Sequence, residues 1–167
     1  MDNWLHDIPP LRSPRKAKPK VIRTYRYDLK KLYYDARRVM FEREYSAAWK
    51  EGEYYDNPFP AIETTNGFSR YIEDVLNNLG HHCERVNTTG IWTNKGWRRS
   101  GSTKGSTDLH CIVNTKPWQI EVKKGADDLN PAQVKYQSKM NRIGVAHTVL
   151  YVGELDKFWD EFNGMVG

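Results

Sequence analysis

Apolar side chains near the start of the chain recur with the period of a helix. From Tyr25 to Ala47 they follow one another at three- and four-residue steps, while most basic residues fall off that stripe. We expect a helix over 25–51, within a segment 25–56 that ends before Pro58. The stripe needs a packing partner, which is either the rest of the chain or a second copy. We predict a homodimer formed through this helix.

A second amphipathic pattern covers residues 67–79 and predicts another helix. Asn66 is its expected N-cap, and Gly80 is the expected residue just past its end. A short strand should follow around 82–86. Residues 88–106 are rich in Gly, Ser and Thr and predict a long loop, which in a small domain often carries function.

Alternating apolar and polar residues predict a hairpin in the middle of the chain, with strands over 107–113 and 118–124. Capping signals then mark a helix over 131–142, with Asn130 as N-cap, a proline in its first position and a glycine at its end. A strand over 146–152 and a short helix over 154–162 follow.

The segment from 118 to 152 has the order strand, helix, strand, so we expect its two strands to pair in parallel. The full order predicts an α/β fold with an αβββαβ core behind an N-terminal helical extension. We divide the chain into an arm (1–24), the helical segment (25–56) and a main domain (57–167).

Composition and charge fit a nucleic-acid partner. The 167 residues carry a net charge of +5, which suits nucleic acid and also suits an ordinary basic protein. Residues 12–23 combine basic residues and prolines with no acid, so they form either a phosphate-binding arm or a solvated tail.

Neither a membrane segment nor a disulfide framework is evident in the sequence. No apolar run approaches the roughly 18 residues that span a bilayer, and the N-terminus lacks the apolar core of a signal peptide. Cys83 and Cys111 stand alone, and Cys111 alternates with apolar residues as a core residue would. We expect a reducing, cytoplasmic location and no membrane partner.

The hairpin also carries the candidate chemistry of the chain. If Val113 lies opposite Trp118, Asp108 faces Lys123 and His110 faces Glu121, so that two carboxylates and a lysine share one face. Two close carboxylates suit Mg²⁺ or Mn²⁺, and a lysine beside them suits a phosphate substrate. The alternative is a salt bridge on a solvated sheet face.

Three short motifs, GSTKGSTD, IEVKKG and LNPAQVKYQ, resemble the core of the PD-(D/E)xK nucleases. They look most like the virus-type replication–repair nuclease (VRR-NUC) branch found in small stand-alone phage and prophage proteins. The resemblance covers about residues 64–152 and implies a restriction-endonuclease-like core. It makes Asp108 the PD aspartate, although Thr107 replaces the proline. Glu121 and Lys123 become the (D/E)xK pair, and Gln133 the glutamine that opens the next helix.

The resemblance leaves one metal ligand open. Family members often carry a Glu near the start of the first helix, a position that falls near Asn66 and Gly67 here. Glu63 precedes that position, and Glu73 lies farther along the helix. Glu73 is therefore either a further metal ligand, besides Asp108 and Glu121, or a solvated helix residue.

Contacts to DNA are expected from basic and aromatic residues of the arm and the loop. These residues are Arg15, Lys16, Lys18, Lys95, Trp97, Arg98, Arg99 and Lys104.

The function implied by the resemblance is a nuclease that cuts DNA with the help of Mg²⁺ or Mn²⁺. It implies a structure-selective enzyme of phage or bacterial DNA replication, recombination or repair, working in the bacterial host cytoplasm if phage-encoded. Its products carry 5′-phosphate and 3′-hydroxyl ends. Two alternatives stay open: an inactive nucleic-acid-binding module of the same fold, and a structural protein that works through its long helix.

Overall fold

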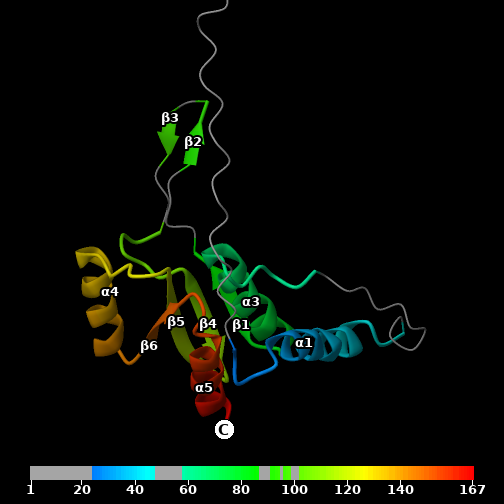
Figure 1. Ribbon diagram of the computed structural model, residues 1–167. Helices are drawn as coiled ribbons and strands as arrows, with labels where there is room; N and C mark the ends of the chain where they lie inside the picture. The colour runs from blue at the N-terminus through cyan, green and yellow to red at the C-terminus, as the bar shows by residue number, and fades with distance from the viewer. Residues whose placement is uncertain (1–23, 48–57, 87–90, 95, 99–101) are drawn as a thin grey trace, which may run out of the picture.

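The protein is a mixed α/β fold. Its computed structural model describes residues 24–47, 58–86, 91–94, 96–98 and 102–167. Within these residues four helices pack around a four-stranded sheet, and a separate two-stranded ribbon stands apart from it (Figure 1). The elements in chain order are α1 (Leu29–Glu44), α3 (Thr65–Asn78), β1 (His82–Arg85), β2 (Ile91–Thr93), β3 (Gly96–Arg98), β4 (Leu109–Val113), β5 (Lys116–Lys123), α4 (Pro131–Arg142), β6 (Ala146–Tyr151) and α5 (Leu155–Val166).

The main sheet has the strand order β1-β4-β5-β6. Strand β4 is antiparallel to both of its neighbours, whereas β5 and β6 are parallel, as the strand–helix–strand order predicts. The predicted order of a helix, three strands, a helix and a strand is present as α3, β1, β4, β5, α4 and β6. The prediction of a plain loop over 88–106 was wrong, because β2 and β3 pair there as an antiparallel ribbon.

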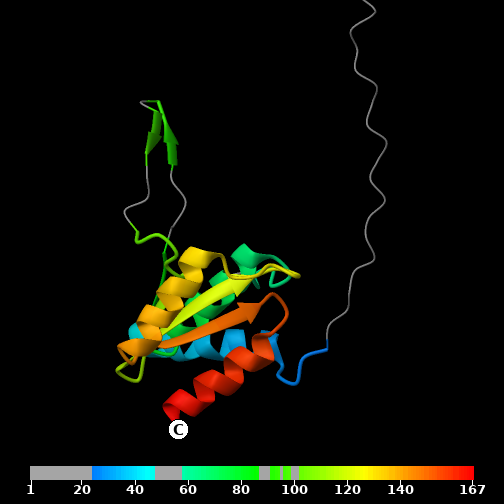
Figure 2. The ribbon, with the colours of Figure 1, turned by 90° about the vertical axis from the view of Figure 1, so that its left-hand side faces the viewer.

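Helices cover both faces of the sheet, with α4 on one side and α5 on the other (Figure 2). The apolar face of β5 packs on α5, where the rings of Trp118 and Phe158 stack with their centroids 5.7 Å apart. Trp118 Nε1 donates a 3.0 Å hydrogen bond to Thr148 Oγ1 on β6, so the buried indole N–H has a partner. Alternation along β5 therefore directs its polar side chains to the opposite face, beneath α4.

Helix α1 packs on its own chain. Asp28 caps it by accepting a hydrogen bond from the Lys31 backbone N–H at 3.0 Å, so the helix begins later than predicted. Leu29 and Tyr33 are buried. Tyr71 of α3 donates a hydrogen bond from its hydroxyl to the Leu29 carbonyl at 3.2 Å. The first half of the predicted stripe thus has an intramolecular partner. Residues 48–57, where the predicted helix ends, lie outside the described residues.

Helix α3 begins earlier than predicted, because Thr64 and not Asn66 is its N-cap. Thr64 Oγ1 accepts a 3.0 Å hydrogen bond from the Gly67 N–H. A side chain at Gly67 would meet the Ala61 carbonyl oxygen at 2.1 Å, so this close turn needs a glycine. Gly80 follows the helix with a φ of 90° and ends it as predicted.

The β4–β5 hairpin has a tighter turn than predicted. Asn114 and Thr115 have φ values of 49° and 68° and form a two-residue connection that places Val113 opposite Lys116. Pro117 then lies within β5. In such a hairpin its position is a non-hydrogen-bonded one, so its missing N–H costs no ladder bond.

The tighter turn moves the pairing by two residues. His110 lies opposite Gln119 and not Glu121, and the predicted pairing of Asp108 with Lys123 was also wrong. Because a shift of two preserves the alternation, each side chain keeps its predicted face.

The C-terminal elements largely follow the prediction. Asn130 caps α4 in a capping box, and Gly144 follows that helix with a φ of 79°. Helix α5 is longer than expected and reaches Val166, because Met165 still packs against the core near its end.

The two cysteines are neighbours across β1 and β4. Cys83 pairs with Cys111 in the register, both thiols are free and buried, and their sulfur atoms lie 2.9 Å apart. The prediction that Cys111 is a core residue is confirmed.

Candidate functional site

The candidate site lies where the start of α4 covers β5. Glu121 and Lys123 stand on the same face of β5, since alternate residues of a strand point the same way. Glu121 is 3% exposed, and its strand is flanked by β4 and β6. A carboxylate in such a place is rare unless a partner compensates for its lost hydration.

Lys123 and Gln133 supply partners for one oxygen of Glu121. Lys123 Nζ lies 3.1 Å from Glu121 Oε1, with side chains only 13% and 4% exposed. The Gln133 amide donates from Nε2 to the same oxygen and accepts a 2.9 Å hydrogen bond from Lys123 Nζ at Oε1. The three residues singled out by the resemblance on β5 and α4 therefore form one contiguous hydrogen-bonded group.

Local sequence holds Gln133 in this position. Its Oε1 also accepts the Asn130 N–H at 3.0 Å, while Asn130 Oδ1 accepts the Gln133 N–H at 3.1 Å. This reciprocal cap sets where α4 begins and which way its first side chains point.

Asp108 lies beside this group, immediately before β4. Its Oδ2 accepts a 2.9 Å hydrogen bond from the backbone N–H of Val122, the residue after Glu121. Its carbonyl accepts the Val86 N–H at 2.8 Å, which ties it to the end of β1. Continuing the register of the hairpin by one residue places Asp108 level with Glu121.

The surroundings of Glu121 favour its protonated form. Burial, followed by the negative charge of Asp108, raises the pKa of Glu121 to about 7, although Lys123 and Gln133 oppose the shift. Its second oxygen, Oε2, is buried and has no hydrogen-bond partner among the described residues. Buried polar atoms without a partner are uncommon and often mark a site that binds an ion or ligand.

The unpartnered oxygen fits a divalent cation. Asp108 and Glu121 offer the oxygen ligands that Mg²⁺ and Mn²⁺ prefer, and Mg²⁺ often binds through one or two carboxylates while keeping several waters. Within the described parts of the chain, no group of three or more His, Cys, Asp or Glu side chains could hold a metal ion together. Among the described residues, Asp108 and Glu121 are the two carboxylates that could contact such an ion together.

Among the described residues, Glu73 of α3 does not form a group of three metal-binding side chains with Asp108 and Glu121. Glu73 lies near Arg85, and burial raises the pKa of Glu73 while Arg85 lowers it. At the position where the resemblance implies a Glu, Asn66 instead accepts a 3.0 Å hydrogen bond from Arg85 Nη2. In the described residues Glu73 therefore joins no metal-binding group.

The segment before Asp108 is held tightly against α4. Gly105 has a φ of 82°, and a side chain there would meet the Ala132 carbonyl oxygen at 2.4 Å. Ser106 and Thr107 are buried; Ser106 Oγ lies 3.0 Å from His110 Nε2, and Thr107 Oγ1 donates to the Leu109 carbonyl at 3.2 Å. Thr107, which replaces the motif's proline, therefore orders the chain beside Asp108.

Most of the predicted DNA contacts lie outside the described residues. Of the loop residues, Lys104 is described and exposed. The ribbon strand β3 carries Trp97 and Arg98, of which only the backbone is described. The remaining predicted contacts, Lys95, Arg99, Arg15, Lys16 and Lys18, lie outside the described residues.

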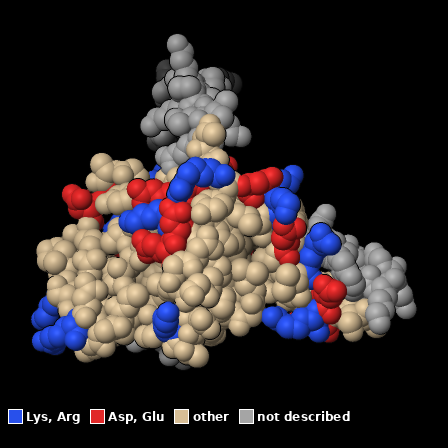
Figure 3. Space-filling model, turned by 90° about the horizontal axis from the view of Figure 1, so that it is seen from below, with Lys and Arg blue, Asp and Glu red and all other residues tan. Residues whose placement is uncertain are grey.

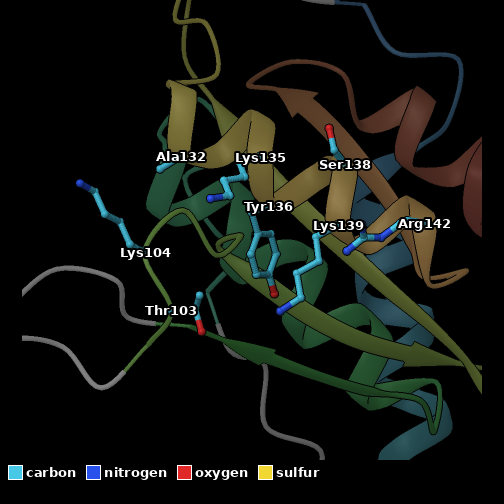
Figure 4. A pocket seen from close by; sticks show the side chains of 8 residues that line it. All are labelled: Thr103, Lys104, Ala132, Lys135, Tyr136, Ser138, Lys139 and Arg142. Atoms are coloured by element: carbon cyan, nitrogen blue, oxygen red, sulfur yellow. The ribbon is translucent and has the colours of Figure 1, made fainter.

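Sequence reasoning missed a groove beside the site. Its volume is about 660 Å³, and it runs between α4 and the chain at Thr103 and Lys104 (Figure 4). Lys135, Lys139 and Arg142 line it from α4. The sequence does contain a signal for this groove. The three cations recur at steps of four and three residues, so they share one face of the helix.

Comparisons with protein-family models, with curated proteins and with solved structures found no match for this chain. Among the described helices, none combines the length and the apolar character needed to cross a membrane.

Proposed function

We propose that this protein is a divalent-metal-dependent DNA nuclease with a restriction-endonuclease-like αβββαβ core. The observation that carries the proposal is the environment of Glu121. This buried carboxylate has a lysine at 3.1 Å on one oxygen, no partner among the described residues on the other, and Asp108 alongside. The site thus combines a place for a cation with a place for an anionic substrate.

Asp108 and Glu121 would hold the cation, with Glu121 using its free oxygen Oε2. The bound cation supplies a Lewis acid that neutralises phosphate charge and lowers the pKa of a water molecule. The other groups belong to the chain itself. Lys123 stabilises negative charge that develops on the phosphate, and Gln133 holds Lys123 and Glu121 in a common geometry.

The reaction is hydrolysis of a phosphodiester. Water attacks phosphorus, the bond from phosphorus to the 3′ oxygen breaks, and that oxygen leaves with a proton as a 3′-hydroxyl. The other product keeps the phosphate on its 5′ end. DNA is the proposed substrate, in keeping with the net charge of +5. The proposed setting is phage or bacterial DNA replication, recombination or repair in the cytoplasm.

Cleavage assays test the proposal directly. Labelled single-stranded, duplex, flapped and four-way DNA is incubated with the protein in Mg²⁺, in Mn²⁺ and in EDTA. Cleavage should require the cation and should be lost in Glu121→Gln and Lys123→Ala, with folding checked by circular dichroism. Glu84→Gln is a matched control, because Glu84 is an exposed carboxylate on β1. Full cleavage in EDTA, or by folded Glu121→Gln protein, would overturn the proposal.

A second candidate is a nucleic-acid-binding module of the same fold without catalysis. It is favoured by Asn66, which occupies the expected position of a first-helix Glu and is bound by Arg85. The same assays separate the two functions. A module of this kind binds the DNA substrates but leaves them intact with either cation.

A further inference from the structure

The groove beside α4 concentrates positive charge. Lys104, Lys135, Lys139 and Arg142 line it, and none of them forms an ion pair with any described residue. In Figure 3, acidic and basic side chains are interspersed along one edge of the face in view. The groove differs from that edge in that its cations form no ion pair with a described residue.

The groove also contains an aromatic ring. Tyr136 is half-buried, and its side chain extends into the groove alongside Lys139, facing Thr103 across the gap (Figure 4). Its hydroxyl has no hydrogen-bond partner among the described residues. A ring between cations is the combination with which proteins bind single strands, because the cations contact phosphates while unpaired bases stack on the ring.

The groove adjoins the candidate site, and close backbone packing holds its two walls in position. Ala132 lines the groove and precedes Gln133, which contacts Lys123 and Glu121. The opposite wall is held in place by Gly105, whose backbone meets Ala132 so closely that no side chain would fit. The two walls therefore form the groove without any ligand.

We infer that this groove binds a single strand of nucleic acid and leads it to the site at Glu121. The phosphates contact Lys135, Lys139 and Arg142, and one base stacks on Tyr136. From residue 135 to residue 142 the helix rises about 10 Å. The cations are therefore spread along the groove, so that each can contact a different phosphate of the strand. Bases of a closed duplex are already stacked and paired, so the ring selects an unpaired strand. The inference rests on the proposed function, since it names the substrate class of that site.

Binding is measured by fluorescence anisotropy with a labelled single-stranded oligothymidylate in EDTA, so that no cleavage occurs. The affinity is followed from about 50 to about 200 mM salt. Lys135→Ala/Lys139→Ala should reduce the slope of log K against log salt by about 1.4, since each single-strand phosphate contact contributes about 0.7. Lys30→Ala/Lys31→Ala removes two cations from α1 and should leave the slope unchanged.

The role of Tyr136 is tested by changing its side chain and by removing the bases from the oligonucleotide. Tyr136→Ala should weaken binding about 5- to 150-fold, the range for a lost stacked base. Tyr136→Phe should stay within about twofold of the wild type, because the ring is kept. An abasic strand should bind the wild type and Tyr136→Ala equally. If Tyr136→Ala weakens both strands alike, or changes neither, the ring does not stack on a base and the inference fails.

Two further outcomes would overturn the inference. One is a salt slope that the α4 double variant shares with the wild type. The other is a poly-glutamate peptide that binds as tightly as the oligonucleotide, which would make the groove a site for acidic peptides. The results also separate the two proposals. If groove variants lose binding but no cation supports cleavage, the proposed function fails, and of the inference only the binding of a single strand by the groove holds. If cleavage occurs and the groove variants bind as tightly as the wild type, the proposed function holds and the inference fails.

Discussion

Gln133 accepts a 2.9 Å hydrogen bond from Lys123 Nζ, and the same oxygen accepts the backbone N–H of Asn130 at 3.0 Å. One side chain thus serves both the cap of α4 and the candidate site. Its two roles can be separated, because the cap needs only an acceptor, whereas Glu121 needs the donor that Gln133 Nε2 provides.

Gln133→Ala should reduce both cleavage and stability, with a loss of about 0.5–1.5 kcal/mol for the missing hydrogen bond to the Asn130 N–H. Gln133→Glu keeps a capping acceptor and should retain most of that stability. It should still lose cleavage, because it sets a second carboxylate against Glu121 and removes the amide donor. Urea unfolding and cleavage rates measure the two effects. Full activity in the Gln133→Glu protein would limit Gln133 to capping.

Stability without metal should depend on the ionisation of Glu121. Its pKa is raised from 4.5 to about 7, so the folded protein holds this proton more tightly than the unfolded chain does. The contribution is therefore fully present below about pH 4.5 and is lost as pH rises to about 7, a change of about 3 kcal/mol. The glutamine in Glu121→Gln cannot ionise, so this variant should not lose stability in this way as the pH rises.

The measurement is urea unfolding in EDTA at about pH 5 and about pH 8 for the wild type and for Glu121→Gln. The variant should gain stability relative to the wild type at the higher pH. An equal pH dependence in both proteins would show that Glu121 is ionised over the whole range.

Gly105→Ala should destabilise the protein more than Gly144→Ala does. The two glycines have φ values of 82° and 79°, so the backbone strain of an alanine is nearly the same, about 1–2 kcal/mol. Only at Gly105 does the new carbon meet another atom, the Ala132 oxygen at 2.4 Å, while Gly144 has nothing within 4 Å. Denaturant titration of both variants measures the difference between their losses in free energy of unfolding, which reports the contact between Gly105 and Ala132. Similar losses in the two variants would contradict the prediction.

Gly105→Ala should also lower cleavage, since the displaced segment leads directly to Asp108. Gly144 lies at the far end of α4, so the Gly144→Ala protein should cleave DNA at the rate of the wild type.

The two cysteines should resist alkylation in the folded protein. Both are buried, and the neighbouring Cys111 thiol together with burial raises the pKa of Cys83, which suppresses its reactive thiolate. Iodoacetamide should label them only as the protein unfolds. Mass spectrometry along a urea titration measures this, and rapid labelling of the folded protein would contradict it.

Self-association through the N-terminal helix remains a prediction. Leu29 and Tyr33 are buried within their own chain, but Val39 farther along α1 is 48% exposed. Val39→Glu should therefore shift a dimer toward monomer without unfolding the protein. Sedimentation at micromolar concentration, with and without DNA, measures the state. A wild type that stays monomeric in both conditions would end the dimer hypothesis.

The sequence alone determined the elements whose signals are local. Asn130, the proline after it and Gly144 define α4 through backbone groups within one turn, so neighbouring residues suffice to predict its ends. The alternation along β5 likewise assigned Glu121 and Lys123 to one face, because side chains of any strand alternate. The right-handed crossover that makes β5 and β6 parallel followed from their order along the chain.

How these elements meet depends on contacts between residues that lie far apart in the sequence. The register of β4 and β5 depends on left-handed backbone at Asn114 and Thr115, which neither residue type requires. The unpartnered oxygen of Glu121 and its raised pKa arise from burial and from Asp108, 13 positions earlier in the chain. The groove exists because Gly105 lets two distant segments touch. Such contacts join residues that no local pattern relates, so only the folded chain determines them.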